Sequence, residues 1–120
     1  MFGQRKVKDL SPEAVRAELA ERRILLVDVR EPAEFAVERI HGAVNAPLST
    51  FDPQALPEAE DRLIVFSCGS GKRSAMAVER CLKAGRHIES HLAGGLIAWK
   101  AAGLPTTSVD PDSGRVRDRV

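Results

Sequence analysis

The segment from Leu63 to Ser74 constrains the fold more than any other part of the chain. It opens with an apolar run, Leu63 to Phe66, of the kind found in a buried strand of a parallel sheet. Cys68 and a loop with two glycines follow, and a helical pattern then extends from Ser74 to Lys83. Because open α/β sheets bind ligands where a strand ends and a helix begins, the sequence predicts a site at this turn.

Cys68 is the candidate nucleophile of this turn. The loop glycines allow a tight turn whose backbone N–H groups point inward and form a nest for an anion. Those N–H dipoles, the helix N-terminus and the charges of Lys72 and Arg73 all favour the thiolate. A free cysteine is more often a small buried hydrophobe, but its place between a strand end and a glycine turn favours chemistry here. We expect this nest to supply the thiolate without a general base.

The loop Cys68-Gly69-Ser70-Gly71-Lys72-Arg73 resembles the Cys-x-x-Gly-x-Arg pattern of the rhodanese family of sulfurtransferases. Four further segments are similar to boxes of that family and occur in the family's order: 28–30 with 34–35, 40–47, 92–99 and 103–105. At the second box, Arg39, directly before residue 40, stands where the family usually has His, and His41 stands where it usually has Pro. The likeness covers roughly residues 5–105, and ordered motifs are far more specific than a single one.

The resemblance implies a three-layer α/β/α rhodanese-like fold, with a parallel sheet of about five strands in the order 3-2-4-5-1 and helices on both faces. It also implies a catalytic role for Cys68, which would take sulfane sulfur from a donor such as thiosulfate and hold it as a persulfide. A thiophilic acceptor, either cyanide or a cellular thiol, would then remove that sulfur. The substrate-binding residues, acting through backbone N–H groups and side chains, would be Gly69, Ser70, Gly71, Lys72, Arg73 and Ser74.

Hydrophobic patterning predicts the same alternation of strands and helices. Short apolar runs predict strands within residues 5–10, 24–27, 44–45, 63–66 and 88–92. Helices are predicted from Pro12 to about Arg22 with Ser11 as N-cap, from Pro32 with Phe35 facing the core, over 74–83, and after Gly95. The segment 47–61, with two internal prolines, is predicted to be a loop with one helical turn.

A chain of 120 residues is expected to form one domain, residues 1–120, with a core at about 5–105 and a polar C-terminal tail at 106–120. Its 43% hydrophobic and 29% charged residues are ordinary for a globular protein. A net charge of +1 gives no reason to expect a nucleic-acid partner. Because no long apolar span and no apolar stretch behind Met1 occur, we expect neither a membrane span nor a signal peptide.

Two cysteines do not make a disulfide framework, and a reactive thiol needs reduction, so the expected location is cytoplasmic. Cys81 lies roughly 12 Å along the helix from the loop, which predicts core packing and no resolving role. His87 and His91 fall in a predicted strand, about 13 Å apart, too far to share one ion. We expect no metal and no cofactor, and either a monomer or a weak homodimer.

Charged residues near the predicted strand ends have two interpretations. Asp28, Arg30 and Glu34 have the composition of an acid/base group, but an ion-pair and hydrogen-bond network that supports the strand ends is the more ordinary role, and we favour it. Arg73, the sixth residue of the loop, is predicted either to face the substrate or to brace the loop. His41 lies close to a turn, where solvation is its ordinary state.

Two alternative functions stay open at this stage. The first is a non-catalytic persulfide carrier or sensing module that serves a partner protein, so that a protein is a candidate sulfur acceptor beside a small thiol or cyanide. The second, less favoured, is a related phosphatase or arsenate reductase. That chemistry uses a Cys-x5-Arg loop to enclose an oxyanion, whereas only four residues separate Cys68 from Arg73 here.

Overall fold

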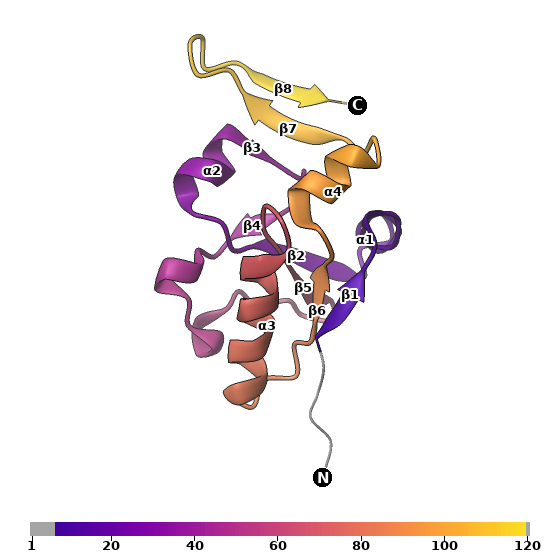
Figure 1. Cartoon of the computed structure of the whole chain (residues 1–120), viewed down its shortest axis with the longest axis vertical. Coiled ribbons are helices and arrows are strands. Elements are labelled where there is room, and N and C mark those ends of the chain that lie inside the picture. The colour runs from indigo at the N-terminus through magenta and orange to yellow at the C-terminus, as the bar shows by residue number, and fades with distance from the viewer. Residues whose placement is uncertain (1–6, 120) are drawn as a thin grey trace.

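The computed structural model describes residues 7–119 and places a five-stranded parallel sheet at the centre of the molecule (Figure 1). The strand order is β1-β6-β5-β2-β4, which is the order expected from the resemblance. The strands of this sheet are β1 (Lys8–Leu10), β2 (Ile24–Asp28), β4 (Val44–Asn45), β5 (Leu63–Ser67) and β6 (Ser90–Leu92). All four neighbouring pairs are parallel, so the carboxyl ends of the strands meet at one edge.

Helices cover both faces of this sheet, which confirms the three-layer α/β/α arrangement (Figure 1). The helices are α1 (Pro12–Ala20), α2 (Pro32–Val37), α3 (Lys72–Lys83) and α4 (Gly95–Ala101), with short 3-10 turns η1 (Leu48–Thr50) and η2 (Pro53–Ala55). Alternate residues of β2 point to opposite faces. Leu25 and Val27 pack with α3, whereas Ile24 and Leu26 pack with α1 and α4. The core is therefore divided into two apolar layers by the sheet.

Local sequence signals explain several element boundaries. Ser11 caps α1 as predicted, since its side chain accepts a hydrogen bond from the Ala14 N–H at 3.1 Å. Leu63 differs from the prediction of a buried run, because it lies at the start of β5 and is 72% exposed. Phe35 was predicted to face the core, but it is only half-buried. The Arg39 guanidinium lies 5.2 Å from its ring centroid. Residues 5 and 6 of the first predicted strand lie outside the described residues.

The C-terminal segment is not the irregular tail that its polar composition predicts. Strands β7 (Thr106–Val109) and β8 (Val116–Arg119) form an antiparallel hairpin. Strand β7 also pairs with β3 (Glu38–Arg39), so the hairpin belongs to a second sheet of order β3-β7-β8 (Figure 1). The Thr106 hydroxyl donates to the Glu38 carboxylate at 2.7 Å. The hairpin is thereby joined to the segment that follows α2.

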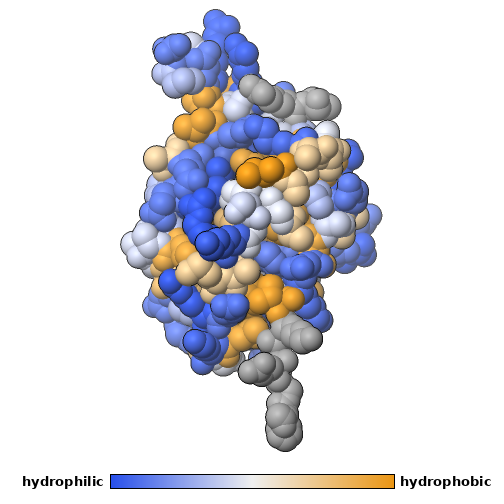
Figure 2. All heavy atoms as spheres, in the orientation of Figure 1, coloured by the Kyte–Doolittle hydropathy of each residue, from blue (hydrophilic) through white to orange (hydrophobic). Residues whose placement is uncertain are grey.

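The surface carries no continuous apolar band on the side shown in Figure 2, where hydrophobic atoms occur as separate patches among hydrophilic ones. The tip of the projecting hairpin is hydrophilic in the same view. Residues 7–119 include no helix long and apolar enough to span a membrane.

Cys81 occupies the α3 layer of the core with 0% exposure, as predicted, and burial raises the pKa of its thiol. Replacing it with alanine is expected to lower the free energy of unfolding by about 1 kcal/mol, because a small cavity is left. The sulfur transfer that the resemblance implies should not depend on Cys81 and should stay near normal. Urea denaturation and a thiosulfate assay on the same preparation test both expectations. Loss of turnover in a folded Cys81→Ala variant would mean that Cys81 takes part in the chemistry.

Candidate active site

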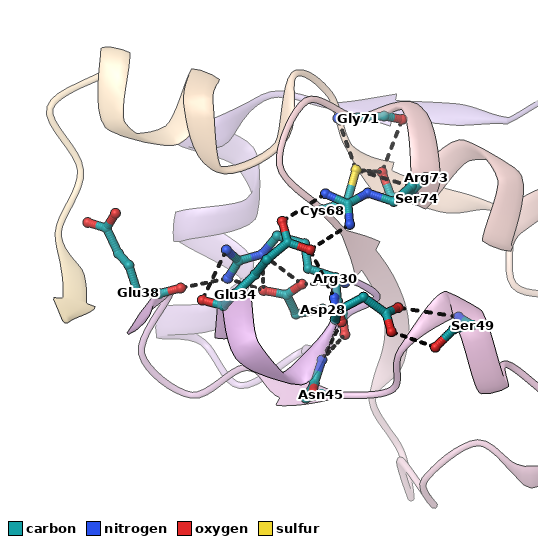
Figure 3. Close-up of polar contacts among 11 residues, drawn as sticks. Asp28, Arg30, Glu34, Glu38, Asn45, Ser49, Cys68, Gly71, Arg73 and Ser74 are labelled. Atoms are coloured by element: carbon teal, nitrogen blue, oxygen red, sulfur yellow. Dashed lines mark hydrogen bonds and ion pairs between the residues drawn. The ribbon is translucent and has the colours of Figure 1, made fainter. Parts of the chain in front are cut away.

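The candidate active site is built around Cys68, which follows β5 directly and faces the first turn of α3 (Figure 3). The Gly71 N–H donates to the Cys68 Sγ at 3.1 Å, and the Ser74 N–H does so at 3.3 Å. The Ser74 Oγ lies 3.5 Å from the same sulfur. Gly71 adopts φ 96°, a left-handed conformation that favours glycine and turns the chain into the helix. The nest expected from the glycine turn is therefore present and encloses the sulfur.

The polar contacts of Cys68 act against its burial. Cys68 is 1% exposed, and this burial raises the pKa of the thiol. Hydrogen bonds from the Ser74 hydroxyl and from the N–H groups of Ser74, Gly71 and Ser70 lower it by more. The net result is a pKa below the ordinary value of a cysteine, so the loop favours the thiolate.

Helix α4 fixes the Cys68 loop from the other side. The N–H of Leu96 donates to the Cys68 carbonyl at 2.8 Å, and the N–H of Ile97 donates to the Gly69 carbonyl at 3.0 Å. This approach needs Gly95 at the start of α4, because a Cβ there would collide with the Cys68 carbonyl oxygen and lie 2.6 Å from that of Gly69. The segment 92–99, which resembles a family box, thus holds the loop by two of its carbonyls, while the N–H groups of Gly71 and Ser74 donate to the sulfur.

Asp28 and Arg30 form a buried ion pair at the carboxyl end of β2, each residue being 5% exposed. The Arg30 guanidinium donates to both Asp28 carboxylate oxygens, at 2.8 Å from Nη2 to Oδ2, and also to the Glu38 carbonyl at 2.6 Å (Figure 3). The Asn45 amide donates to the Asp28 and Arg30 carbonyls at 3.0 and 2.9 Å. These contacts support the strand ends, and no contact between this pair and Cys68 is recorded among the described residues.

The sequence interpretation expected Glu34 to belong to one network with Asp28 and Arg30. The carboxylate of Glu34 does not bond to that pair. Its carboxylate receives two hydrogen bonds from Arg73, at 2.7 Å from Nη1 and 3.1 Å from Nη2 (Figure 3). This contact lowers the pKa of Glu34 to about 2 and raises that of Arg73. Of the two roles expected for Arg73, the geometry favours bracing, because a fork-to-fork pair joins α3 to α2. Lys72, by contrast, is exposed.

Neutralising Glu34 tests the strength of that brace. We expect Glu34→Gln to lower the free energy of unfolding at pH 7 by at most about 1 kcal/mol, because both side chains are partly exposed to solvent. The pKa of about 2 lies below the ordinary 4.5, so the contribution is complete above pH 4.5 and is lost as the pH falls toward 2. Thermal melts of this variant and of the exposed control Glu79→Gln, from pH 7 to pH 2, measure the difference. A deficit specific to Glu34→Gln that persists at pH 2 would contradict the ion-pair explanation.

Sequence reasoning missed His91, which the structure places next to the Cys68 loop. His91 is 5% exposed, and its Nδ1 lies 2.7 Å from the Ser74 Oγ. No spacing rule signals this contact, because β6 and α3 meet only in the folded sheet. One available signal was the position of His91 at the carboxyl end of a predicted strand. His41 is exposed, as its turn position suggests, and His87 lies before β6.

Similarity to known proteins shows the family of this chain. The family model described as "Rhodanese-like domain" matches residues 11–102, and the chain belongs to this family. An uncharacterized protein of Synechocystis is 43% identical over 97 residues, which cover 81% of this chain and 54% of that protein. The chain thus spans about half the length of this relative. A protein of Allochromatium vinosum named "Sulfurtransferase" is 35% identical over 100 residues, covering 82% of this chain and 94% of that protein.

Solved structures agree on the fold. The rhodanese-like domain of a protein from Anabaena superposes with a TM-score of 0.73 at 28% identity, covering 84% of this chain and 79% of that one. The resemblance expected from the ordered motifs is confirmed by both comparisons. The hairpin β7–β8 begins after residue 102 and so lies outside the matched family region.

Proposed function

We propose that this protein is a sulfurtransferase that carries sulfane sulfur as a persulfide on Cys68. The observation that carries the proposal is the ring of N–H donors at the end of β5, with Gly71 and Ser74 at 3.1 and 3.3 Å from the sulfur. A family in which a 35% identical relative is named a sulfurtransferase supports the same chemistry. Roles for Gly69, Ser70 and Lys72 in binding the donor belong to this proposal, whereas Arg73 is assigned the bracing role through Glu34.

The proposed reaction has two displacement steps. The Cys68 thiolate attacks the outer sulfur of a donor such as thiosulfate, the sulfur–sulfur bond of the donor breaks, and sulfite leaves with the bonding electron pair. The terminal sulfur of the resulting persulfide is then attacked by cyanide or a thiol, and the thiolate returns. Fixed N–H donors stabilise the anionic sulfur in both steps without having to reorganise. The exposed Lys72 at the loop rim adds a positive charge where an anionic donor arrives.

The low exposure of Cys68, 1%, favours a second candidate function, a persulfide carrier that unloads only to a partner protein. A partner able to reshape the loop rim would reach the sulfur more readily than a small acceptor. The phosphatase alternative is disfavoured because only four residues separate Cys68 from Arg73, and the Arg73 fork is already bound by Glu34.

An assay of turnover with thiosulfate and cyanide, measured as the formation of thiocyanate, tests the proposal. Multiple turnovers with purified protein support an enzyme. One sulfur taken up and no turnover without an added protein acceptor supports the carrier. Hydrolysis of an aryl phosphate without persulfide formation would overturn both. The two free cysteines support a reducing compartment, and we propose the cytoplasm.

A further inference from the structure

His91 is a buried imidazole with a hydrogen-bond partner on each ring nitrogen, and the sulfur-transfer mechanism described so far does not use it. Its Nδ1 lies 2.7 Å from the Ser74 Oγ, and its Nε2 lies 2.7 Å from the Asp9 Oδ1. His91 lies on β6 and Asp9 on the neighbouring edge strand β1. The Asp9 side chain is 72% exposed, whereas that of His91 is 6% exposed. The imidazole therefore connects an exposed carboxylate with the inside of the active-site loop.

Ser74 extends this connection to the sulfur. Its Oγ is 3.5 Å from the Cys68 Sγ, where the thiol hydrogen can be donated to the hydroxyl oxygen. The same Oγ is 3.2 Å from the Gly71 carbonyl, a longer contact than the 2.7 Å to His91. All four side chains are thus joined in one line, in the order carboxylate, imidazole, hydroxyl and sulfur.

The number of hydrogens on each group sets the direction of these bonds. The Asp9 carboxylate only accepts, so the Nε2 of His91 carries a hydrogen toward it. In the neutral imidazole, Nδ1 is then an acceptor and takes the single hydroxyl hydrogen of Ser74. In the imidazolium, Nδ1 donates to the Ser74 oxygen, and the hydroxyl hydrogen is free to point at the sulfur. The protonation state of His91 therefore decides whether Ser74 accepts from a thiol or donates to a thiolate.

We propose that His91 is a positioning residue that takes up the Cys68 proton through Ser74, which revises the expectation from the sequence that the thiolate needs no base. The S–H bond of Cys68 breaks as an O–H bond forms on Ser74, and the original O–H bond of Ser74 breaks as an N–H bond forms at Nδ1. The electron pair stays on sulfur, so a thiolate and an imidazolium result and no oxidant or reductant is needed. The role in turnover rests on the proposed sulfur transfer, whereas the proton step needs only the thiol.

The surroundings of the imidazole leave Asp9 as its charged partner. Among the side chains of residues 7–119, two form hydrogen bonds with the ring: Asp9 on β1, which accepts from Nε2, and Ser74 on α3, whose Oγ lies against Nδ1. From β5, the apolar Phe66 is the residue in register with His91. From the loop, the backbone of Gly71 approaches the ring, since a Cβ there would lie 3.7 Å from Cε1. A charge on His91 is thus stabilised by one carboxylate and coupled to one thiol.

The pH dependence of Cys68 alkylation tests the proposal without any sulfur donor. Iodoacetamide reacts with the thiolate, so its rate against pH follows the thiolate fraction. For His91→Gln we expect the midpoint to rise by about one pH unit and the rate at pH 6 to fall about tenfold. His87→Gln is the matched control, because His87 is an exposed histidine close in sequence. Its alkylation profile should match that of the unchanged protein. Coincident profiles for folded His91→Gln and His87→Gln would overturn the proposal.

Two further measurements test the proposal even if the His91→Gln variant does not fold. Asp9→Asn changes an exposed side chain and should raise the midpoint less than His91→Gln does, so that the alkylation rate at pH 6 falls about threefold. In addition, the His91 ring proton can be titrated by NMR in the unchanged protein and in Cys68→Ala. Linkage is reciprocal, so removing the thiolate should make the imidazolium titrate at lower pH. An unchanged His91 midpoint would overturn the proposal.

These readouts separate the two proposals. Absence of a persulfide after thiosulfate treatment, with linked titrations of His91 and Cys68, would reject sulfur transfer and retain the proton step. Normal persulfide formation with independent titrations would reject the role of His91 and retain sulfur transfer.

Discussion

Replacing Cys68 with serine is expected to abolish the proposed sulfur transfer and leave the fold intact. The hydroxyl is close in size to the thiol and can keep hydrogen bonds to the Gly71 and Ser74 N–H groups, so the loop should hold its shape. A serine hydroxyl is not ionised at neutral pH, however, and the ring of donors then surrounds no nucleophile. We expect the thiosulfate turnover to fall on the order of 10³-fold or more.

The control for this loss is Cys81→Ala, which removes the other thiol of the chain. Thiocyanate formation is measured for both variants, and circular dichroism checks that each is folded. Substantial turnover in folded Cys68→Ser protein would place the nucleophile elsewhere. Equal losses in the two variants would show that the assay responds to stability and not to the position of the sulfur.

The second large effect is expected for Gly95→Ala. This substitution disturbs the contact between α4 and the Cys68 loop and leaves the reacting groups unchanged. Gly95 has φ 60°, and an added Cβ would collide with the Cys68 carbonyl and lie 2.6 Å from the Gly69 carbonyl oxygen. The variant must therefore strain the backbone and weaken the two hydrogen bonds from α4 to the loop. We expect the free energy of unfolding to fall by roughly 3 to 5 kcal/mol. Turnover of the folded fraction should fall on the order of 10²-fold, as when fixed donors are displaced.

Gly103→Ala is the matched control, because Gly103 also has a left-handed φ, 74°, but an added Cβ has nothing within 4 Å. Its cost should be about 1 to 2 kcal/mol from backbone strain alone, with turnover unchanged. Urea denaturation and turnover of both variants are compared on the same preparations. Similar stability and turnover in the two variants would show that α4 does not hold the Cys68 loop.

Local patterning was sufficient for the strands of the main sheet and for the shape of the Cys68 loop. The apolar runs at 24–27 and 63–66, the Ser11-Pro12 helix start and the glycine turn after Cys68 are short-range signals, and each predicted an element that the structure contains. Strand order came from the family resemblance and not from patterning. The ion pair between Asp28 and Arg30 belongs to the network expected at the strand ends, but the carboxylate of Glu34, expected in the same network, bonds to Arg73.

The contacts that patterning missed join segments far apart in the chain. Glu34 bonds to Arg73 across 39 positions, and His91 meets Asp9 across 82. Such pairs depend on the three-dimensional arrangement of the strands, which residue spacing does not encode. The hairpin at 106–119 was missed for another reason, since its strands are polar, short and outside the matched family region. Its pairing with β3 follows from tertiary context.

The most direct test of the central claim is the intact mass of the protein after incubation with thiosulfate and removal of the excess. We predict a gain of one sulfur atom per chain, located by peptide mapping on the Cys68 peptide and released by cyanide. Cys68→Ser should gain none, and Cys81→Ala should gain one. An unmodified mass for the unchanged protein, or a sulfur atom located on Cys81, would contradict the account of Cys68 as the sulfur-carrying nucleophile.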